Sequence, residues 1–324
     1  MNESVETNIS HRRRRYYSPF LEYNDDSNNT TAQTAAAMII LNTPIPSIDD
    51  SNTATNVFQI LWNSSSFHVC ADGGANRLYD ATRTSTTTST TTAVDDLYLP
   101  DLITGDLDSL RTDVRTYYEE RGVKIVQVVD QDYHDLDKSL MIIDSQNNNQ
   151  RQESSTISND GTAIMYKTFI YGGFGGRFDQ EMACINTLYS WGCKESFRLT
   201  QMSIWNEETG VILLPKDPVM NEIMICFPGL NEEYDKGIDE SDGDETDKDR
   251  ITIIGEGPTC GLIPIGGRCE KVYTTGLKWN LNGDMPLEFG GLVSSSNRIV
   301  ERLVTVRTSS PLLFSFEIVR RLSR

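Results

Sequence analysis

Acidic residues and glycines recur at four places where an apolar run of the sequence ends. The four segments are Asp72-Gly73-Gly74, Gly105-Asp106-Leu107-Asp108, the stretch from Asp130 to Asp135, and the stretch from Gly172 to Asp179. Ligands of open α/β sheets bind at the carboxyl ends of the strands, so we expect these segments to meet in one crevice. The residue types then indicate the chemistry of that crevice.

Four aspartates of these segments would lie close together, namely Asp72, Asp106, Asp108 and Asp135. Carboxylates in one cleft repel one another unless a cation neutralises them. Oxygen ligands without His or Cys partners suit Mg²⁺, which usually takes one or two carboxylates together with substrate phosphates. The sequence therefore predicts a site for a metal-nucleotide complex. The alternative for any single aspartate is that it caps the helix after its strand.

The fourth segment has the composition of a phosphate-binding loop. Its paired glycines, 172–173 and 175–176, let backbone N–H groups approach phosphate oxygens. The guanidinium of Arg177 can bind a phosphate through two hydrogen bonds, and Asp179 stands at the start of an expected helix. A Gly-rich turn can also be only a turn. The chain lacks the P-loop motif and the strict dinucleotide-binding motif, so neither of those classes is expected.

Alternating strands and helices are expected to position these segments. Apolar runs predict strands at 35–41, 67–71, 102–104, 124–129 and 168–171, with helical segments between them. That alternation is typical of a parallel sheet with helices on both faces. From about residue 199, short apolar runs separated by Gly, Pro and Asn predict an antiparallel sandwich or barrel. The expected fold class is α/β, a parallel-sheet nucleotide-binding domain followed by an all-β sandwich domain.

The predicted organisation has three parts. Residues 1–30 are expected to be a disordered arm, residues 31–198 the α/β domain that holds the metal-nucleotide site, and residues 199–324 the β-sandwich domain. Polar tracts at 82–92 and 146–161 are expected to be inserted loops, and residues 231–249 an acidic loop.

Charge and cysteine usage exclude several classes of protein. The net charge of −18 disfavours nucleic acid and anionic membranes as partners. No apolar run reaches the roughly 18 residues that span a bilayer. The six cysteines form no C-x-x-C pair, so we expect reduced thiols, a reducing compartment and a cytoplasmic location.

Six stretches of the chain resemble, in order, the motifs of eukaryotic thiamine pyrophosphokinases. They are CADGGANRLYD (70–80), LITGDLDSLR (102–111), DQDYHDLDKSL (130–140), GGFGGRFDQEMACINTL (172–188), CGLIPIGGRCEKVYTTGLKWNL (260–281) and FGGLVSSSN (289–297). The resemblance implies a homodimer with active sites where the two subunits meet. It implies transfer of a pyrophosphoryl group from ATP to the hydroxyl of thiamine, which gives thiamine diphosphate and AMP.

The resemblance also implies roles for particular residues on the ATP side of the site. Asp106 and Asp108 would hold Mg²⁺ with the ATP phosphates, helped by Asp135 and Asp72. Other residues would contact the nucleotide or shape the loop around it, and these are Gln131, Gly173, Gly176, Arg177 and Asp179. Asp135 or Asp72 would accept the proton of the thiamine hydroxyl, and the sequence does not choose between them.

On the thiamine side, the resemblance implies that Trp279 stacks on the substrate rings and that Ser296 and Asn297 help to define the pocket. The role of Trp279 also makes physical sense, because the positive thiazolium ring is attracted to an indole face. The alternative is that Trp279 is buried in the core of the β-domain.

The third motif departs from the family pattern. His134 stands where the family usually has Thr, and Asp137 replaces a later Thr, whereas Asp135 and Lys138 stay in register. The departure leaves the expected metal ligands in place but changes nearby hydrogen bonds. Two alternative functions stay open, a non-catalytic thiamine or nucleotide sensor on the same fold and a transferase with another acceptor.

Overall fold

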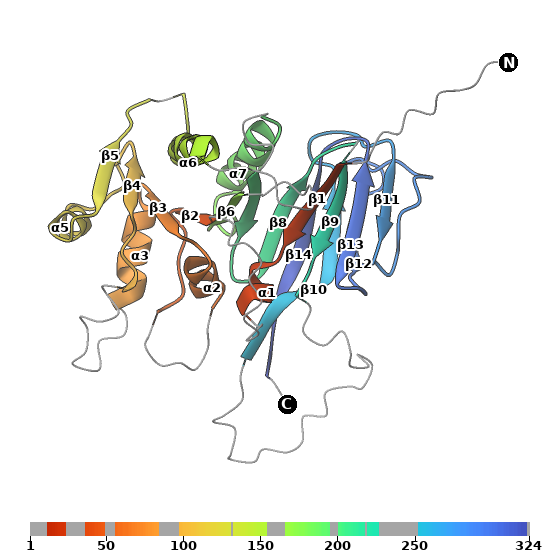
Figure 1. The fold of residues 1–324 in the computed structure, drawn as a ribbon, viewed down its shortest axis with the longest axis horizontal. Helices are drawn as coiled ribbons and strands as arrows, with labels where there is room; N and C mark the ends of the chain where they lie inside the picture. The colour runs from red at the N-terminus through yellow and green to blue at the C-terminus, as the bar shows by residue number, and fades with distance from the viewer. Residues whose placement is uncertain are drawn as a thin grey trace, which may run out of the picture.

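The computed structural model has a mixed α/β fold with one large sheet and a β-rich carboxy-terminal part (Figure 1). It describes residues 12–23, 36–48, 56–83, 97–130, 132–153, 166–194, 200–217, 219–226 and 252–322. The ten strands of the large sheet follow the order β12-β10-β14-β8-β7-β6-β2-β3-β4-β5. Within the described residues, no helix is long and apolar enough to cross a membrane.

One half of this sheet consists of parallel pairs. Its strands are β2 (Ala36–Ile40), β3 (Phe67–Ala71), β4 (Leu102–Gly105), β5 (Lys124–Gln127), β6 (Tyr166–Tyr171) and β7 (Thr200–Trp205). The pairings β2–β3, β3–β4, β4–β5, β2–β6 and β6–β7 are all parallel. Every residue of β2 is buried, as expected for a central strand covered on both faces.

Helices cover both faces of the parallel half. They are α2 (Val57–Asn63), α3 (Gly74–Arg83), α5 (Thr112–Glu120), α6 (Asp135–Glu153) and α7 (Phe178–Gly192). Met38 and Ile40 of β2 pack in the core cluster that contains α2, α3 and α5, whereas Ile39 packs in the cluster that contains α6 and α7. The alternation follows from the two-residue period of a strand.

The carboxy-terminal strands extend the same sheet and add a second one. Antiparallel pairing joins β8 (Thr209–Leu214), β14 (Leu312–Leu322), β10 (Thr252–Ile263) and β12 (Ser294–Arg298) to the parallel half through β7. The second sheet has the order β1-β9-β13-β11, in which β9 is Val219–Met224, β13 is Leu303–Thr308 and β11 is Val272–Thr275. The large sheet therefore continues across the boundary expected at residues 198 and 199.

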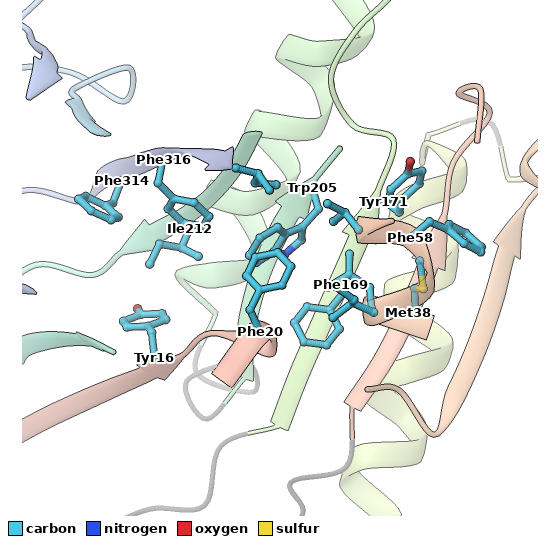
Figure 2. Close-up of a cluster of buried hydrophobic side chains, with 14 of the residues drawn as sticks. Tyr16, Phe20, Met38, Phe58, Phe169, Tyr171, Trp205, Ile212, Phe314 and Phe316 are labelled. Carbon is cyan, nitrogen blue, oxygen red and sulfur yellow. The ribbon is translucent and has the colours of Figure 1, made fainter. Parts of the chain in front are cut away.

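The expected disordered arm is wrong for residues 12–23. Strand β1 (Arg12–Tyr17) pairs in parallel with β9, and helix α1 (Pro19–Tyr23) follows it. The ring of Phe20 is fully buried and lies edge-on to Trp205 with ring centroids 5.7 Å apart (Figure 2). The hydroxyl of Tyr16 donates to the carbonyl oxygen of Leu213 at 3.1 Å. The burial of these aromatic side chains thus stabilises a segment whose polar composition predicts disorder.

The polar insertions are described only in part. Helix α6 continues to Glu153, so the start of the loop expected at 146–161 is helical instead. Its run of Asn, Gln and Ser carries no helix-breaking Gly or Pro, which allows the helix to continue. The tract from 84 to 92 and the acidic loop at 231–249 lie outside the described residues.

Candidate active site

A cleft of about 890 Å³ lies at the carboxyl ends of the parallel strands. All four segments that follow strands contribute to its wall. The contributing residues include Asp72 and Gly73 after β3, Asp106 after β4, Tyr133 to Asp135 at the start of α6, and Gly172 to Arg177 after β6. The structure therefore brings together the segments that the sequence predicts to meet, because parallel strands end at one edge of their sheet.

Three carboxylates form a cluster in this cleft. One oxygen from each of Asp72, Asp106 and Asp135 lies within 4.8 Å of the others. The backbone N–H of Asp106 also donates to Oδ1 of Asp135 at 3.3 Å. A Cβ on Gly105, whose φ is +147°, would lie 2.9 Å from Cβ of Asp72 and 3.0 Å from Oδ1 of Asp135. Glycine at this position therefore allows the three carboxylates to converge.

Asp72 is the buried member of the cluster, with 4% of its surface exposed. Its Oδ2 accepts from the backbone N–H of Ser109 at 3.2 Å, whereas its Oδ1 has no hydrogen-bond partner among the described residues. Burial raises the pKa of Asp72, and hydrogen bonds from Ser109 oppose that rise. The neighbouring carboxylates of Asp135 and Asp108 raise this pKa further. A cation at Oδ1 would stabilise the ionised form.

Lys138 balances part of this charge. Its buried Nζ donates to Oδ1 of Asp135 at 3.0 Å, one helical turn along α6. Three carboxylates and one ammonium leave an excess of negative charge when all are ionised. An all-oxygen set with an unsatisfied buried oxygen fits a hard divalent cation such as Mg²⁺.

Asp108 lies outside the three-carboxylate cluster. Its side chain is exposed, and its Oδ1 accepts from the hydroxyl of Ser109 at 2.9 Å. The backbone N–H of Asp108 donates to Oδ1 of Asp106 at 3.4 Å, so the two aspartates share one turn. Its role as a metal ligand stays a prediction.

The Gly-rich loop presents open backbone to the cleft. A Cβ on Gly175 or Gly176 would meet nothing within 4 Å, and both glycines line the cleft together with Gly173. The N–H of Gly175 donates to Oε1 of Glu181 at 2.9 Å, which ties the loop to the first turns of α7. The loop therefore combines access for a ligand with a fixed attachment to its helix.

Arg177 and Asp179 pair with each other at the rim. Nε of Arg177 donates to Oδ1 of Asp179 at 3.1 Å, and its terminal nitrogen donates to Oδ2. The hydrogen bond from Arg177 lowers the pKa of Asp179. Both side chains are exposed, so the pair can rearrange when a ligand arrives. The predicted role of Gln131 falls on a residue that lies outside the described residues.

Sequence reasoning missed several polar residues of this region. Asn42, Arg77, Ser109 and Glu181 all line the cleft. Asn42 had an available signal, because it directly follows the apolar run at 35–41 and thus occupies the end of a fifth parallel strand. Arg77 and Glu181 each lie in the first half of a helix, where a charged side chain is typical of a solvated surface.

The residues predicted to bind thiamine lie together, away from this cleft. The amide of Asn297 donates to the carbonyl oxygen of Trp279 at 2.9 Å and accepts from its backbone N–H at 3.3 Å. The Trp279 side chain is 56% exposed, and the adjacent Ser296 is exposed as well. The three residues do not contribute to the wall of the carboxylate cleft within one chain. An exposed indole argues against the alternative that Trp279 is a core residue.

Comparisons with known proteins agree with both halves of this arrangement. Residues 58–200 match the family described as "Thiamin pyrophosphokinase, catalytic domain", and residues 246–313 match "Thiamin pyrophosphokinase, vitamin B1 binding domain". "Thiamine pyrophosphokinase 1" of Arabidopsis thaliana is 32% identical over 87% of this chain and 86% of its own length. "Thiamine pyrophosphokinase" of Saccharomyces cerevisiae is 32% identical over 81% of each chain.

A solved structure gives the same answer for the fold. The structure "Thiamin pyrophosphokinase from Candida albicans" superposes with a TM-score of 0.66 and 26% identity, and the match covers 95% of this chain and 93% of that one. A catalytic half with a carboxylate cluster and a vitamin-binding half define a transferase. The chain belongs to the thiamine pyrophosphokinase family, which confirms the resemblance of its six motifs.

Proposed function

We propose that this enzyme transfers a pyrophosphoryl group from ATP to the hydroxyl of thiamine, with thiamine diphosphate and AMP as products. The observation that carries the proposal is the cluster of Asp72, Asp106 and Asp135 beside a Gly-rich loop in one cleft. Pyrophosphoryl transfer needs little covalent chemistry from a protein and depends on positioning and on charge neutralisation. The cleft provides groups for both tasks.

We propose that the cleft binds ATP together with Mg²⁺. Asp72, Asp106 and Asp135 would hold the ion, with Asp108 as the further ligand that the sequence predicts. Bound Mg²⁺ would neutralise phosphate charge as the transfer proceeds. Lys138 orients the carboxylate of Asp135 through its 3.0 Å hydrogen bond.

Protein groups beyond the carboxylates would bind the phosphates and move the proton. The backbone N–H groups of Gly173 and Gly176 would donate to phosphate oxygens, and Arg177 would release Asp179 and bind a phosphate. Asp72 and Asp135 are the two candidates to accept the hydroxyl proton. The raised pKa of Asp72 would favour proton acceptance by this carboxylate when it carries no cation.

The thiamine pocket is proposed to form between two copies of the chain. Trp279, Ser296 and Asn297 lie together but do not line the carboxylate cleft of their own chain, so one chain does not join the two halves of the site. A homodimer in which the Trp279 side of one subunit faces the cleft of its partner would join them. The exposed indole would stack on the cationic thiazolium ring.

The first test is a product assay with and without metal. We expect purified protein with thiamine, ATP and Mg²⁺ to form thiamine diphosphate and AMP in equal amounts, and excess chelator to abolish both products. Chromatography of the nucleotides and the thiamine esters measures this. Thiamine monophosphate with ADP would place the attack at the γ-phosphorus instead. Binding of thiamine without formation of any product would indicate a thiamine sensor instead of a transferase.

A mixing experiment tests the shared site. Trp279→Ala and Asp106→Asn are each expected to be nearly inactive, because each removes one half of every site. Unfolding and refolding the two variants together at equal amounts should restore about a quarter of wild-type activity, since half of the dimers are mixed and one of their two sites is intact. Light scattering on the same samples measures the mass. An active monomer, or a mixture without recovery, would contradict the dimer.

We also propose a cytoplasmic location. The six cysteines form no disulfide in the structure, which supports this location because a reducing compartment keeps thiols reduced. Fractionation of cells with an antibody against the chain tests this, and recovery of the protein in an organelle would contradict it.

A further inference from the structure

Two arginines line the cleft, and their guanidinium groups are in different states. Arg177 is engaged by the carboxylate of Asp179 through two hydrogen bonds. Arg77 donates only its Nε, at 2.8 Å, to Oδ1 of Asn42, a neutral acceptor. Among the described residues, no carboxylate forms an ion pair with Arg77. Within the described part of the chain, its two terminal nitrogens therefore have no hydrogen-bond acceptor.

The position of Arg77 is set by packing at the ends of two neighbouring strands. Asn42 directly follows β2, and Arg77 lies on α3, which begins after β3. A Cβ on Gly73 would lie 2.4 Å from Nδ2 of Asn42, so the amide rests against the backbone of that glycine. Asn42 thus lies between Gly73 and Arg77 and orients the guanidinium plane. An arginine held by a neutral amide is prepared to bind an anion.

The other described charged groups of the cleft do not pair with Arg77, so its guanidinium is available to a ligand. Lys138 is paired with Asp135, whereas no ion pair joins Arg77 to a carboxylate of the cluster within the described part of the chain. A triphosphate bound with one divalent cation keeps uncompensated negative charge on its remaining oxygens, and a planar guanidinium matches two such oxygens.

We propose that Arg77, oriented by Asn42, binds a phosphate group of the nucleotide. Arg77 is a binding residue, and Asn42 is a positioning residue that acts through it. The inference rests on the proposed use of ATP in this cleft.

The test is the KM for Mg-ATP of Arg77→Gln. Loss of a charge-assisted contact should raise this KM about 10-fold or more and leave the KM for thiamine unchanged. Arg77→Lys keeps the positive charge but lacks the planar guanidinium, and it should raise the KM for Mg-ATP by less. Arg115→Gln is the matched control, because it removes an exposed arginine of α5 that pairs with Glu119 outside the cleft. Its KM values should stay at the wild-type level.

The role of Asn42 is tested by a double-variant cycle. Asn42→Ala should raise the KM for Mg-ATP about threefold in the wild type and should have no effect in the Arg77→Gln background. An Arg77→Gln enzyme whose KM stays within about twofold of the control would overturn the proposal. Equal effects of Asn42→Ala in both backgrounds would remove its positioning role. Thermal midpoints, compared across all variants, separate these outcomes from misfolding.

The two proposals fail in different ways. A wild-type protein that forms no thiamine diphosphate removes the proposed reaction, and titration calorimetry with ATP then still tests Arg77 by binding alone. A wild-type protein that forms the product while Arg77→Gln binds ATP normally removes only the assignment of Arg77.

Discussion

Asp106→Asn is expected to lower turnover by about 10²–10³-fold and to leave the fold intact. The substitution keeps the shape of a half-buried side chain but removes one of three carboxylates whose oxygens lie within 4.8 Å of one another. Steady-state rates at saturating Mg²⁺ measure the loss, and Mn²⁺ binding followed by electron paramagnetic resonance gives a readout that does not depend on activity. Circular dichroism checks the fold.

Two further substitutions complete that experiment. Asp113→Asn removes an exposed carboxylate at the start of α5 and should leave both turnover and Mn²⁺ binding unchanged. Asp108→Asn decides between the ligand set predicted from the sequence and the cluster seen in the structure. A loss of turnover as large as that of Asp106→Asn would show that Asp108 contacts the ion when the ligands are bound. Near-normal turnover of Asp106→Asn itself would contradict the metal assignment.

The second large effect is a loss of stability as the pH rises, caused by one buried carboxyl. Glu256 of β10 is 2% exposed, and its Oε2 accepts from the N–H of Cys226 at 2.9 Å. Its side chain also forms a hydrogen bond with Ser18, just after β1. Burial raises the pKa of Glu256 to about 8, and these hydrogen bonds only partly oppose it. Glu256 therefore stays protonated in the folded protein at neutral pH.

The sign of the effect follows from proton binding. A folded pKa above the unfolded value of 4.5 means that the stabilisation is complete below pH 4.5 and is lost as the pH rises to about 8. Within that window, the free energy of unfolding should fall by at most about 1.4 kcal/mol per pH unit. Urea unfolding at several pH values between 5 and 8 measures this slope.

Glu256→Gln provides the comparison, because it keeps an acceptor for Cys226 but does not titrate. Its unfolding free energy should vary less with pH than that of the wild type, and the difference between the two should grow toward pH 8. Glu301→Gln, at an exposed position, should follow the wild-type profile. Parallel profiles for the wild type and Glu256→Gln would show that Glu256 ionises normally in the folded state.

The experiment on Glu256 also examines the amino-terminal segment. Ser18 and Cys226 belong to segments far apart in the sequence, and the carboxyl of Glu256 contacts both. Ionisation of that carboxyl would weaken the junction between β1, β9 and β10. Residues 12–23, which composition alone assigns to a disordered arm, would then be the first segment to lose protection from hydrogen exchange at high pH.

The sequence by itself determined the parallel strands and the residues that follow them. Each strand is a short apolar run, and its polar successor is adjacent in the chain, so local order is enough to find Asp72, Asp106 and Gly172. The carboxyl ends of parallel strands lie at one edge of their sheet, and this geometric rule predicts the cleft.

Only the tertiary structure decided which distant side chains meet. The burial of Tyr16 and Phe20 depends on Leu213 of β8 and on Trp205, which lie 197 and 185 residues away in the sequence, so the composition of the arm does not reveal these partners. The same holds for the contact of Arg77 with Asn42, for the unpaired oxygen of Asp72 and for the separation of Trp279 from the cleft. Local sequence determines where a strand ends, whereas packing and charge compensation between segments determine what each side chain contacts there.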